Sequence, residues 1–242
     1  MATSTSLGIG ALGRSKPGAP AADALVIVAT LTIGLLVDVH TEIAGQTALS
    51  AAVWAVLFYV LRSVSGEERR GLMTCLVIAT SGEIALSLGW GLYTYRLGNI
   101  PMFVPPGHVL MLLLGLSLAR VMPQSVAYAI FGCAALYSLA AAVAGVDTLG
   151  VALFLVLAFA AFGMPGQRRL YASTFVLSLL LELYGTWLGN WTWAQNVPAT
   201  ALVTTNPPGV VGAFYCALDA SVAAVSMLLA RYWSARARRP RA

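Results

Sequence analysis

The chain divides into successive apolar stretches of about 20 residues, the length that an α-helix needs to cross the hydrocarbon core of a membrane. Eight such stretches can be marked: Ala24–Val39, Ile43–Leu61, Gly71–Tyr95, Met102–Ala119, Val121–Val146, Thr148–Gly166, Leu170–Trp193 and Pro208–Ala230. Hydrophobic residues make up 59% of the 242 residues and charged residues only 10%. A soluble protein of this size could not bury that much apolar surface. The sequence therefore predicts an all-α integral membrane protein with eight transmembrane helices; seven spans are the alternative, because the first stretch is short.

The basic residues support the count of eight. In an eight-span chain, thirteen of the fourteen Lys and Arg residues fall on one side of the membrane, and only Arg96 falls on the other. Cytoplasmic loops of membrane proteins are enriched in Lys and Arg. We therefore expect a bacterial-type plasma membrane protein with both termini in the cytoplasm. Because these cations lie in loops and a tail rather than along one soluble face, nucleic acid is not an expected partner.

Two parts of the chain resemble each other. Each contains a glutamate, then an aromatic-Thr-aromatic triplet, then Pro-Pro-Gly: the glutamates Glu83 and Glu182 are 99 residues apart, and the triplets at 93–95 and 191–193 are 98 residues apart. Duplication would give two parallel four-helix repeats, related by an axis along the membrane normal; chance recurrence of short apolar motifs is the alternative. The predicted organisation is a disordered cytoplasmic arm at 1–23, repeats at 24–120 and 121–231, and a basic tail at 232–242.

Three acidic residues, Glu83, Glu182 and Asp219, lie within the predicted spans. A carboxylate at membrane depth is costly, so such residues are rare and usually functional. The alternative is a structural role, as a protonated acid bonded to a neighbouring helix. The predicted spans place both glutamates in the outer half of the membrane and Asp219 near its middle. We expect the three acids to be catalytic and to line one cavity that opens toward the outer leaflet.

Polar and aromatic residues near these acids are candidates for binding a substrate. They are Trp90, Tyr93, His108, Trp187, Asn190, Trp191, Asn206 and Tyr215. Tryptophan and tyrosine also form interfacial belts, an interpretation that suits Tyr95 and Trp193 better than the deeper Trp90 and Trp187. Asn206 is alternatively a helix N-cap, and His108 an interfacial histidine. Two histidines and three separated cysteines match no metal or haem ligand pattern, so no cofactor is expected.

The pattern Glu182-x-x-Gly185-x-x-x-Gly189-x-Trp191-x-Trp193, followed by Pro-Pro, resembles a motif of small membrane proteins of carotenoid biosynthesis, the bacterioruberin-type carotenoid hydratases and their relatives. The segment from Glu83 to Tyr95, followed by Val104-Pro105, is similar. The chain departs from that motif in lacking Pro-Phe-Gly before the aromatic pair. A weaker likeness is to the small integral-membrane terpene cyclases of meroterpenoid pathways, with Glu83 and Asp219 as the nearest equivalents of their two intramembrane acids.

Both resemblances imply a lipophilic isoprenoid substrate, carotenoid or terpenoid, dissolved among the membrane lipids. They imply hydration, cyclisation or isomerisation without a cofactor. A buried carboxyl group would protonate an alkene or epoxide as a general acid, and aromatic faces would stabilise the carbocation. The residues alone leave two alternatives open. One is a proton- or cation-coupled transporter or a lipid-binding carrier, and the other is a membrane subunit whose acids serve only assembly.

Overall fold

A computed structural model describes residues 21–237 of the chain, and this part is mostly helical. It contains eight α-helices: α2 (Ala21–Val39), α3 (Ile43–Leu61), α4 (Gly66–Glu83), α5 (Val104–Val121), α6 (Gln124–Val143), α7 (Leu149–Gly163), α8 (Arg168–Leu188) and α9 (Gly212–Ala237). A π-helical turn, Ile84–Gly89, extends α4, and a 3₁₀ turn, Pro165–Gln167, precedes α8. Residues 1–20 of the predicted arm lie outside the described residues, and its last three residues, 21–23, belong to α2. Helix α9 runs on to Ala237, so the tail predicted from 232 begins as helix.

Five of these helices are long and apolar enough to cross a membrane: α3, α4 with its π-helical turn, α5, α6 and α9. Helices α7 and α8 pass the same test only as a pair, bent by 105° at Met164. Helix α7 has 15 residues, about 22 Å at 1.5 Å per residue, and α8 begins with Arg168 and Arg169. The predicted helical character is confirmed, and several helices are apolar enough to cross a membrane, consistent with a multi-pass membrane protein; eight spans stay a prediction.

Two helix ends differ from the prediction. The third and seventh apolar stretches were expected to be helical through Tyr95 and Trp193, but the helices end at Gly89 and Leu188. Gly91 has φ of 73° and Gly189 has φ of 87°, a conformation that glycine adopts easily and that ends helices. The triplets beyond them form strands β1 (Tyr93–Tyr95) and β2 (Trp191–Trp193), which pair antiparallel.

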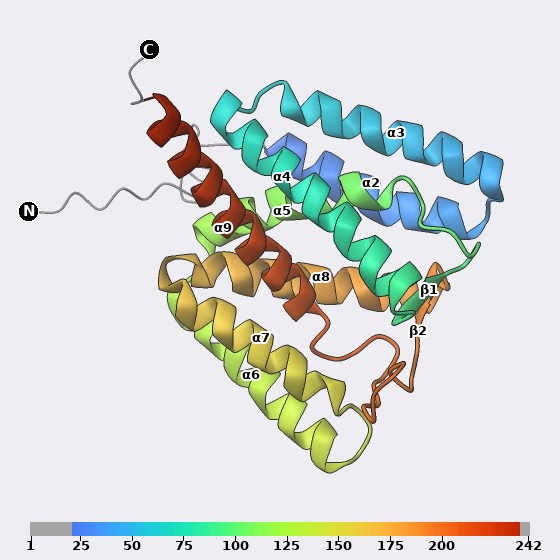
Figure 1. The fold of residues 1–242 in the computed structure, drawn as a ribbon. Helices are drawn as coiled ribbons and strands as arrows, with labels where there is room; N and C mark the ends of the chain where they lie inside the picture. The colour runs from blue at the N-terminus through green and yellow to red at the C-terminus, as the bar shows by residue number, and fades with distance from the viewer. Residues whose placement is uncertain (1–20, 238–242) are drawn as a thin grey trace, which may run out of the picture.

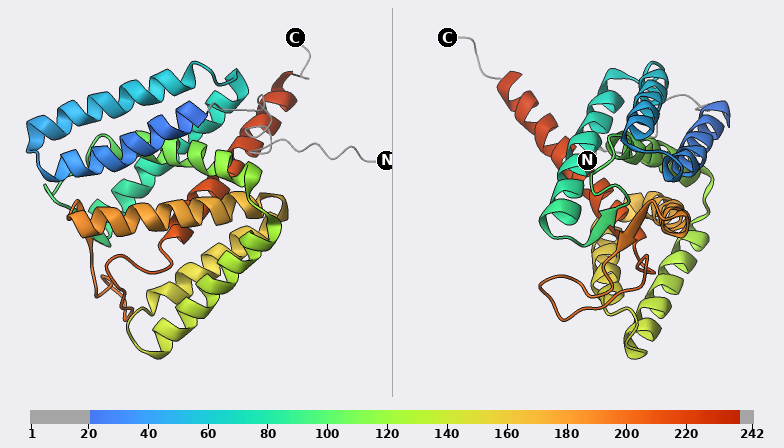
Figure 2. Two further views of the ribbon diagram at one scale, coloured as in Figure 1. Left: turned by 180° about the vertical axis from the view of Figure 1, so that it is seen from behind. Right: turned by 90° about the vertical axis from the view of Figure 1, so that its right-hand side faces the viewer.

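The helices form two outer hairpins around a central group. Helices α2 and α3 lie on one side and α6 and α7 on the other, with α4, α5, α8 and α9 between them (Figures 1 and 2). Within the central group, α4 and α8 each pack against both α5 and α9. The first hairpin packs on α5, and its helix α2 also reaches α8. Helices α2, α3 and α4 therefore all pack against α5.

The two ends of the bundle differ in chemistry. The α3–α4 turn, the α7–α8 turn and the C-terminal end of α9 lie together at one end, and the paired strands lie at the other (Figure 1). The two turns carry basic residues, namely Arg62, Arg69, Arg168 and Arg169 among others. Arg96 follows β1 and donates to the backbone carbonyls of Asp38 and Thr41. This grouping of basic turns agrees with the predicted sidedness of the cations.

Two buried aspartates hold the loops at the strand end. Asp38, at the end of α2, accepts hydrogen bonds from Gln46 Nε2 at 2.8 Å and Asn190 Nδ2 at 2.9 Å. Asp147, before α7, accepts from the Thr204 hydroxyl and from the backbone N–H of Gly209, each at 3.0 Å. Buried polar side chains of this kind are tolerated when hydrogen bonds satisfy them. The loop that follows β2 is therefore fixed in place beside the strands.

Candidate functional site

A cavity of about 280 Å³ lies inside the bundle next to the paired strands. Helices α2 and α3 contribute apolar side chains, such as Leu31, Leu35 and Val53, to one wall. Helices α4, α5, α8 and α9 and both strands contribute the rest of the lining, which includes Glu83 and Glu182. The interior is therefore an apolar space into which two carboxyl groups project.

Glu83 is held by three side chains. Its Oε2 accepts hydrogen bonds from the Tyr95 hydroxyl at 2.7 Å and the Tyr93 hydroxyl at 2.9 Å. Its Oε1 lies 2.9 Å from His108 Nε2. Burial, and next the adjacent Glu83 carboxylate, raise the pKa of both phenols well above the usual range, so both tyrosines stay protonated donors. Glu83 itself is only 6% exposed.

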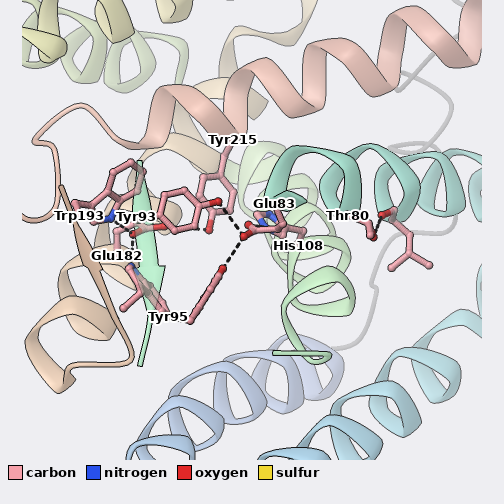
Figure 3. A network of polar contacts seen from close by, with 10 residues as sticks. Thr80, Glu83, Tyr93, Tyr95, His108, Glu182, Trp193 and Tyr215 are labelled. Carbon is pink, nitrogen blue, oxygen red and sulfur yellow. Dashed lines mark hydrogen bonds and ion pairs between the residues drawn. The ribbon is translucent and has the colours of Figure 1, made fainter. Parts of the chain in front are cut away.

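Glu182 is held in a matching way by different residues. Its Oε2 accepts hydrogen bonds from the indole N–H groups of Trp191 at 2.7 Å and Trp193 at 3.1 Å. The Tyr215 hydroxyl donates to Oε1 at a longer 3.4 Å. Glu182 is also 6% exposed. Each glutamate therefore accepts from the two aromatic residues of its own triplet and contacts one further ring from α5 or α9 (Figure 3).

The strand pairing explains this geometry. Tyr93 pairs with Trp193 and Tyr95 with Trp191, and in a strand alternate side chains point to the same face. All four rings are therefore buried on the cavity side, while the two central threonines face outward. The Tyr93 and Trp193 rings are 4.7 Å apart between centroids. The absence of a side chain at Gly185 leaves room for the Trp191 ring, because a Cβ at this position would overlap the ring.

His108 enters the cavity from the start of α5, where Pro105 and Pro106 occupy the first helical turn. Its ring lies 4.9 Å from the Tyr215 ring, centroid to centroid. Its second nitrogen, Nδ1, is buried and has no hydrogen-bond partner. An imidazole with one nitrogen on a carboxylate and the other free can hold or release a proton.

The structure places Asp219 away from this cavity. Asp219 is 2% exposed but is not among the residues that line the cavity. It lies near Thr174 of α8 and Cys216 of α9, and its Oδ2 has no hydrogen-bond partner. The expectation that three acids share one cavity is therefore right for Glu83 and Glu182 and wrong for Asp219, which lies toward Thr174 and Cys216 instead.

The predicted binding residues also divide. Tyr93, His108, Trp191 and Tyr215 line the cavity. Trp187 is 78% exposed, and the Trp90 indole donates to the Pro198 carbonyl, so neither belongs to the lining. Asn190 bonds Asp38 and the Leu35 carbonyl. Asn206 is no N-cap; its Oδ1 accepts from the backbone N–H of Trp193, so both asparagines position β2.

Two residues of the site, Tyr95 and Trp193, were interpreted from the sequence as belt residues. That interpretation assumed that the helices continue through the triplets, which would carry these rings to the membrane surface. The signal that could have found them is the glycine at 91 and at 189, a residue typical of the position just beyond a helix end. A chain that turns there brings the triplet back toward the glutamate that precedes it.

Comparisons with known proteins give no match to a protein family, a curated protein or a solved structure. The chemistry of the site must therefore be inferred from its geometry. Two carboxyl groups, an imidazole with a free nitrogen and aromatic rings surround an apolar space. This combination can transfer protons to and from an apolar ligand and can stabilise positive charge on it.

Proposed function

We propose that the protein is an integral membrane enzyme that transfers protons to and from an isoprenoid dissolved in the bilayer. The observation that carries this proposal is the hydrogen-bonded pair of Glu83 and His108, which faces an apolar cavity with aromatic walls. An apolar lining suits a hydrocarbon, and the carboxyl–imidazole pair is the proton-transfer group that the hydrocarbon would meet. The resemblances to carotenoid hydratases and membrane terpene cyclases favour the same class of substrate.

The proposed reaction begins at an alkene. A proton leaves the Glu83–His108 pair and forms a C–H bond with the π electrons of the alkene, and the other alkene carbon becomes a carbocation. Loss of a neighbouring proton back to the pair gives isomerisation. Attack by a second alkene of the same chain forms a ring and a new carbocation, and loss of a proton from that cation back to the pair completes cyclisation. Addition of water and loss of its proton gives hydration. Each route returns the pair to its starting protonation state; isomerisation and cyclisation need no other reactant, and hydration consumes one water molecule.

We further propose eight spans arranged as two parallel four-helix repeats, with both termini in the cytoplasm. The order of elements supports this: two helices, a helix that ends near its glutamate, a strand and a last helix occur twice, from α2 to α5 and from α6 to α9. The basic turns at one end of the bundle support the sidedness. Reporters fused after Ala242 should be active only in the cytoplasm, and activity outside would contradict an even number of spans.

A proton- or cation-coupled transporter or lipid carrier is the second candidate. The observation that favours it is Asp219, a buried carboxyl group between helices with one oxygen unpaired. Intramembrane acids that are separated in this way occur along ion pathways. A transporter would bind its ligand without changing the ligand's covalent structure, so a product analysis separates the two candidates.

The test uses purified protein in lipid nanodiscs that contain polyene or terpenoid alkenes, with D₂O as solvent. An enzyme of the proposed kind gives a product that carries deuterium on carbon. Glu83→Gln keeps the size of the side chain and should lower the rate by about two to four orders of magnitude, the usual share of general acid–base catalysis. Cys133→Ser, at an exposed site on α6, is the matched control. Deuterium-free substrate recovered from the parent protein with every alkene offered would contradict the proposal.

A further inference from the structure

The two carboxyl groups of the cavity differ in their charged surroundings. Glu83 faces an imidazole, which can carry a positive charge. The hydrogen-bond partners of Glu182 are two indoles and a phenol, all neutral donors. Lys and Arg are absent from the lining of this cavity, as far as the described residues 21–237 form it. A carboxylate at Glu182 would therefore have hydrogen bonds but no cationic side chain bonded to it, in an apolar space where charges are screened little.

The rings around Glu182 add a second attraction for positive charge. The N–H edges of Trp191 and Trp193 point at the carboxyl oxygen, so those edges are occupied. Aromatic faces carry partial negative charge and attract cations, with tryptophan the strongest. The Trp193 ring stacks beside Phe214 with centroids 5.9 Å apart, and both residues line the cavity. The Glu182 end thus combines a carboxyl group with electron-rich rings.

We propose that the Glu182 end of the cavity binds a positively charged centre carried by an apolar chain. This inference rests on the proposed function, because the charged centre formed during turnover would be the carbocation. The two ends then have separate tasks: the Glu83–His108 pair moves the proton, and Glu182 with its indoles stabilises the cation. The proposal also restricts the possible substrates to neutral isoprenoids, because a prenyl diphosphate would need Lys, Arg or a metal ion beside its phosphates.

The test measures binding rather than turnover. The probe is farnesyl-trimethylammonium, and the comparison is its neutral isostere, in which a quaternary carbon replaces the nitrogen. Both are titrated into protein in zwitterionic nanodiscs by calorimetry, with empty nanodiscs subtracted to remove partition into lipid. The ammonium compound should bind at least about tenfold more tightly than the isostere, the scale of a desolvated cation–π contact or more. Farnesyl diphosphate should not compete.

Two matched variants show which of the two carboxyl groups attracts the ammonium compound. Glu182→Gln keeps the hydrogen bonds, because its oxygen can accept from both indoles and its amide can donate to Tyr215. This variant should lose most of the preference for the ammonium compound, and Glu83→Gln should lose less of it, because Glu83 is farther from the indole rings that surround Glu182. The wild-type comparison of ammonium and isostere needs no variant, so a misfolded mutant would not prevent the test.

The outcomes separate the two proposals. Equal binding of ammonium and isostere overturns the cation site, whatever the enzyme does. A preference that disappears in Glu83→Gln and persists in Glu182→Gln overturns the assignment to Glu182 while leaving the proposed enzyme intact. A preference located at Glu182, together with an absence of any deuterated product, supports the cation site and contradicts the enzyme.

Discussion

Glu83 and Glu182 occupy matching positions but have partners of different chemistry. Phenols and imidazole surround Glu83, and all of these groups can both donate and accept hydrogen bonds. Two indoles hold Glu182, and an indole N–H can only donate. The surroundings of Glu83 can therefore rearrange when a proton arrives or leaves, whereas those of Glu182 favour a fixed acceptor. The same backbone geometry thus surrounds the two glutamates with partners of different hydrogen-bonding capacity.

The largest expected effect is at Glu83, whose partner His108 contributes the imidazole. His108→Gln removes the group that shares a proton with Glu83 and should lower turnover by about two to four orders of magnitude. His40→Gln changes the other histidine, which is exposed at the end of α2, and is the matched control. Product formation is measured by chromatography of lipid extracts. Full activity of the His108 variant would place the proton on another group.

The next effect concerns stability. Glu182→Ala leaves two buried indole donors without an acceptor, at about 1–3 kcal/mol for each unsatisfied group. Glu83→Ala should cost less, because the two phenols and the imidazole can bond one another. The free energies of unfolding are compared in the same detergent by tryptophan fluorescence. A larger loss in the Glu83 variant would contradict the distinction between donor-only and exchangeable partners.

A smaller effect should follow from the glycine beneath Trp191. Gly185→Ala forces the Trp191 ring away from Glu182, and overpacking of this kind costs about 1–3 kcal/mol. Gly132→Ala on α6 has open space around the new methyl group and serves as the control. We expect a lower melting temperature for the first variant and an unchanged or slightly higher one for the second. Equal melting temperatures would mean that the ring moves freely.

The smallest effect is at alkaline pH. Burial, and next Glu83, raise the pKa of Tyr95 above its usual value of 10.0, so the folded protein keeps a proton that the unfolded chain loses. Its contribution is complete below about pH 10 and declines as the pH rises further. Tyr95→Phe lacks this group and should be less stable by about 1 kcal/mol at pH 7, with a shallower decline between pH 10 and 11. Parallel melting curves against pH would contradict this.

The sequence predicts the helices well and their ends poorly. The eight apolar stretches correspond to the eight α-helices of residues 21–237, because the length of an apolar run is a strong signal in a membrane chain. The repeated Glu and aromatic triplet mark the two glutamates that share the cavity, and four of the residues named from the sequence line it: Tyr93, His108, Trp191 and Tyr215. Beyond Gly89 and Leu188 the chain is no longer helical, so helical spacing gave the wrong directions for the side chains that follow. Trp90 and Trp187 were therefore favoured over Tyr95 and Trp193.

Asp219 shows a second limit. Its depth along α9 could be estimated from the sequence, but its direction around the helix depends on which neighbours α9 packs against. Helix α9 contacts α4, α7 and α8, so more than one face of it is buried. A polar residue on a helix with several buried faces has no sequence signal that names its neighbour. The catalytic role suggested for Asp219 stays a prediction, and Asp219→Asn should reduce turnover less than Glu83→Gln.

The pairing of β1 with β2 has a consequence for how the chain folds while it is being synthesised. Residues 93–95 leave the ribosome almost a hundred residues before their partners at 191–193. Until then the backbone groups of β1 that face β2 lack partners, and such groups are costly in a lipid environment. The cavity therefore forms only when the second half has been inserted. A chain cut short by a nonsense mutation or a stalled ribosome would contain Glu83 and His108 but would lack Glu182, Trp191 and the other lining residues of the second half.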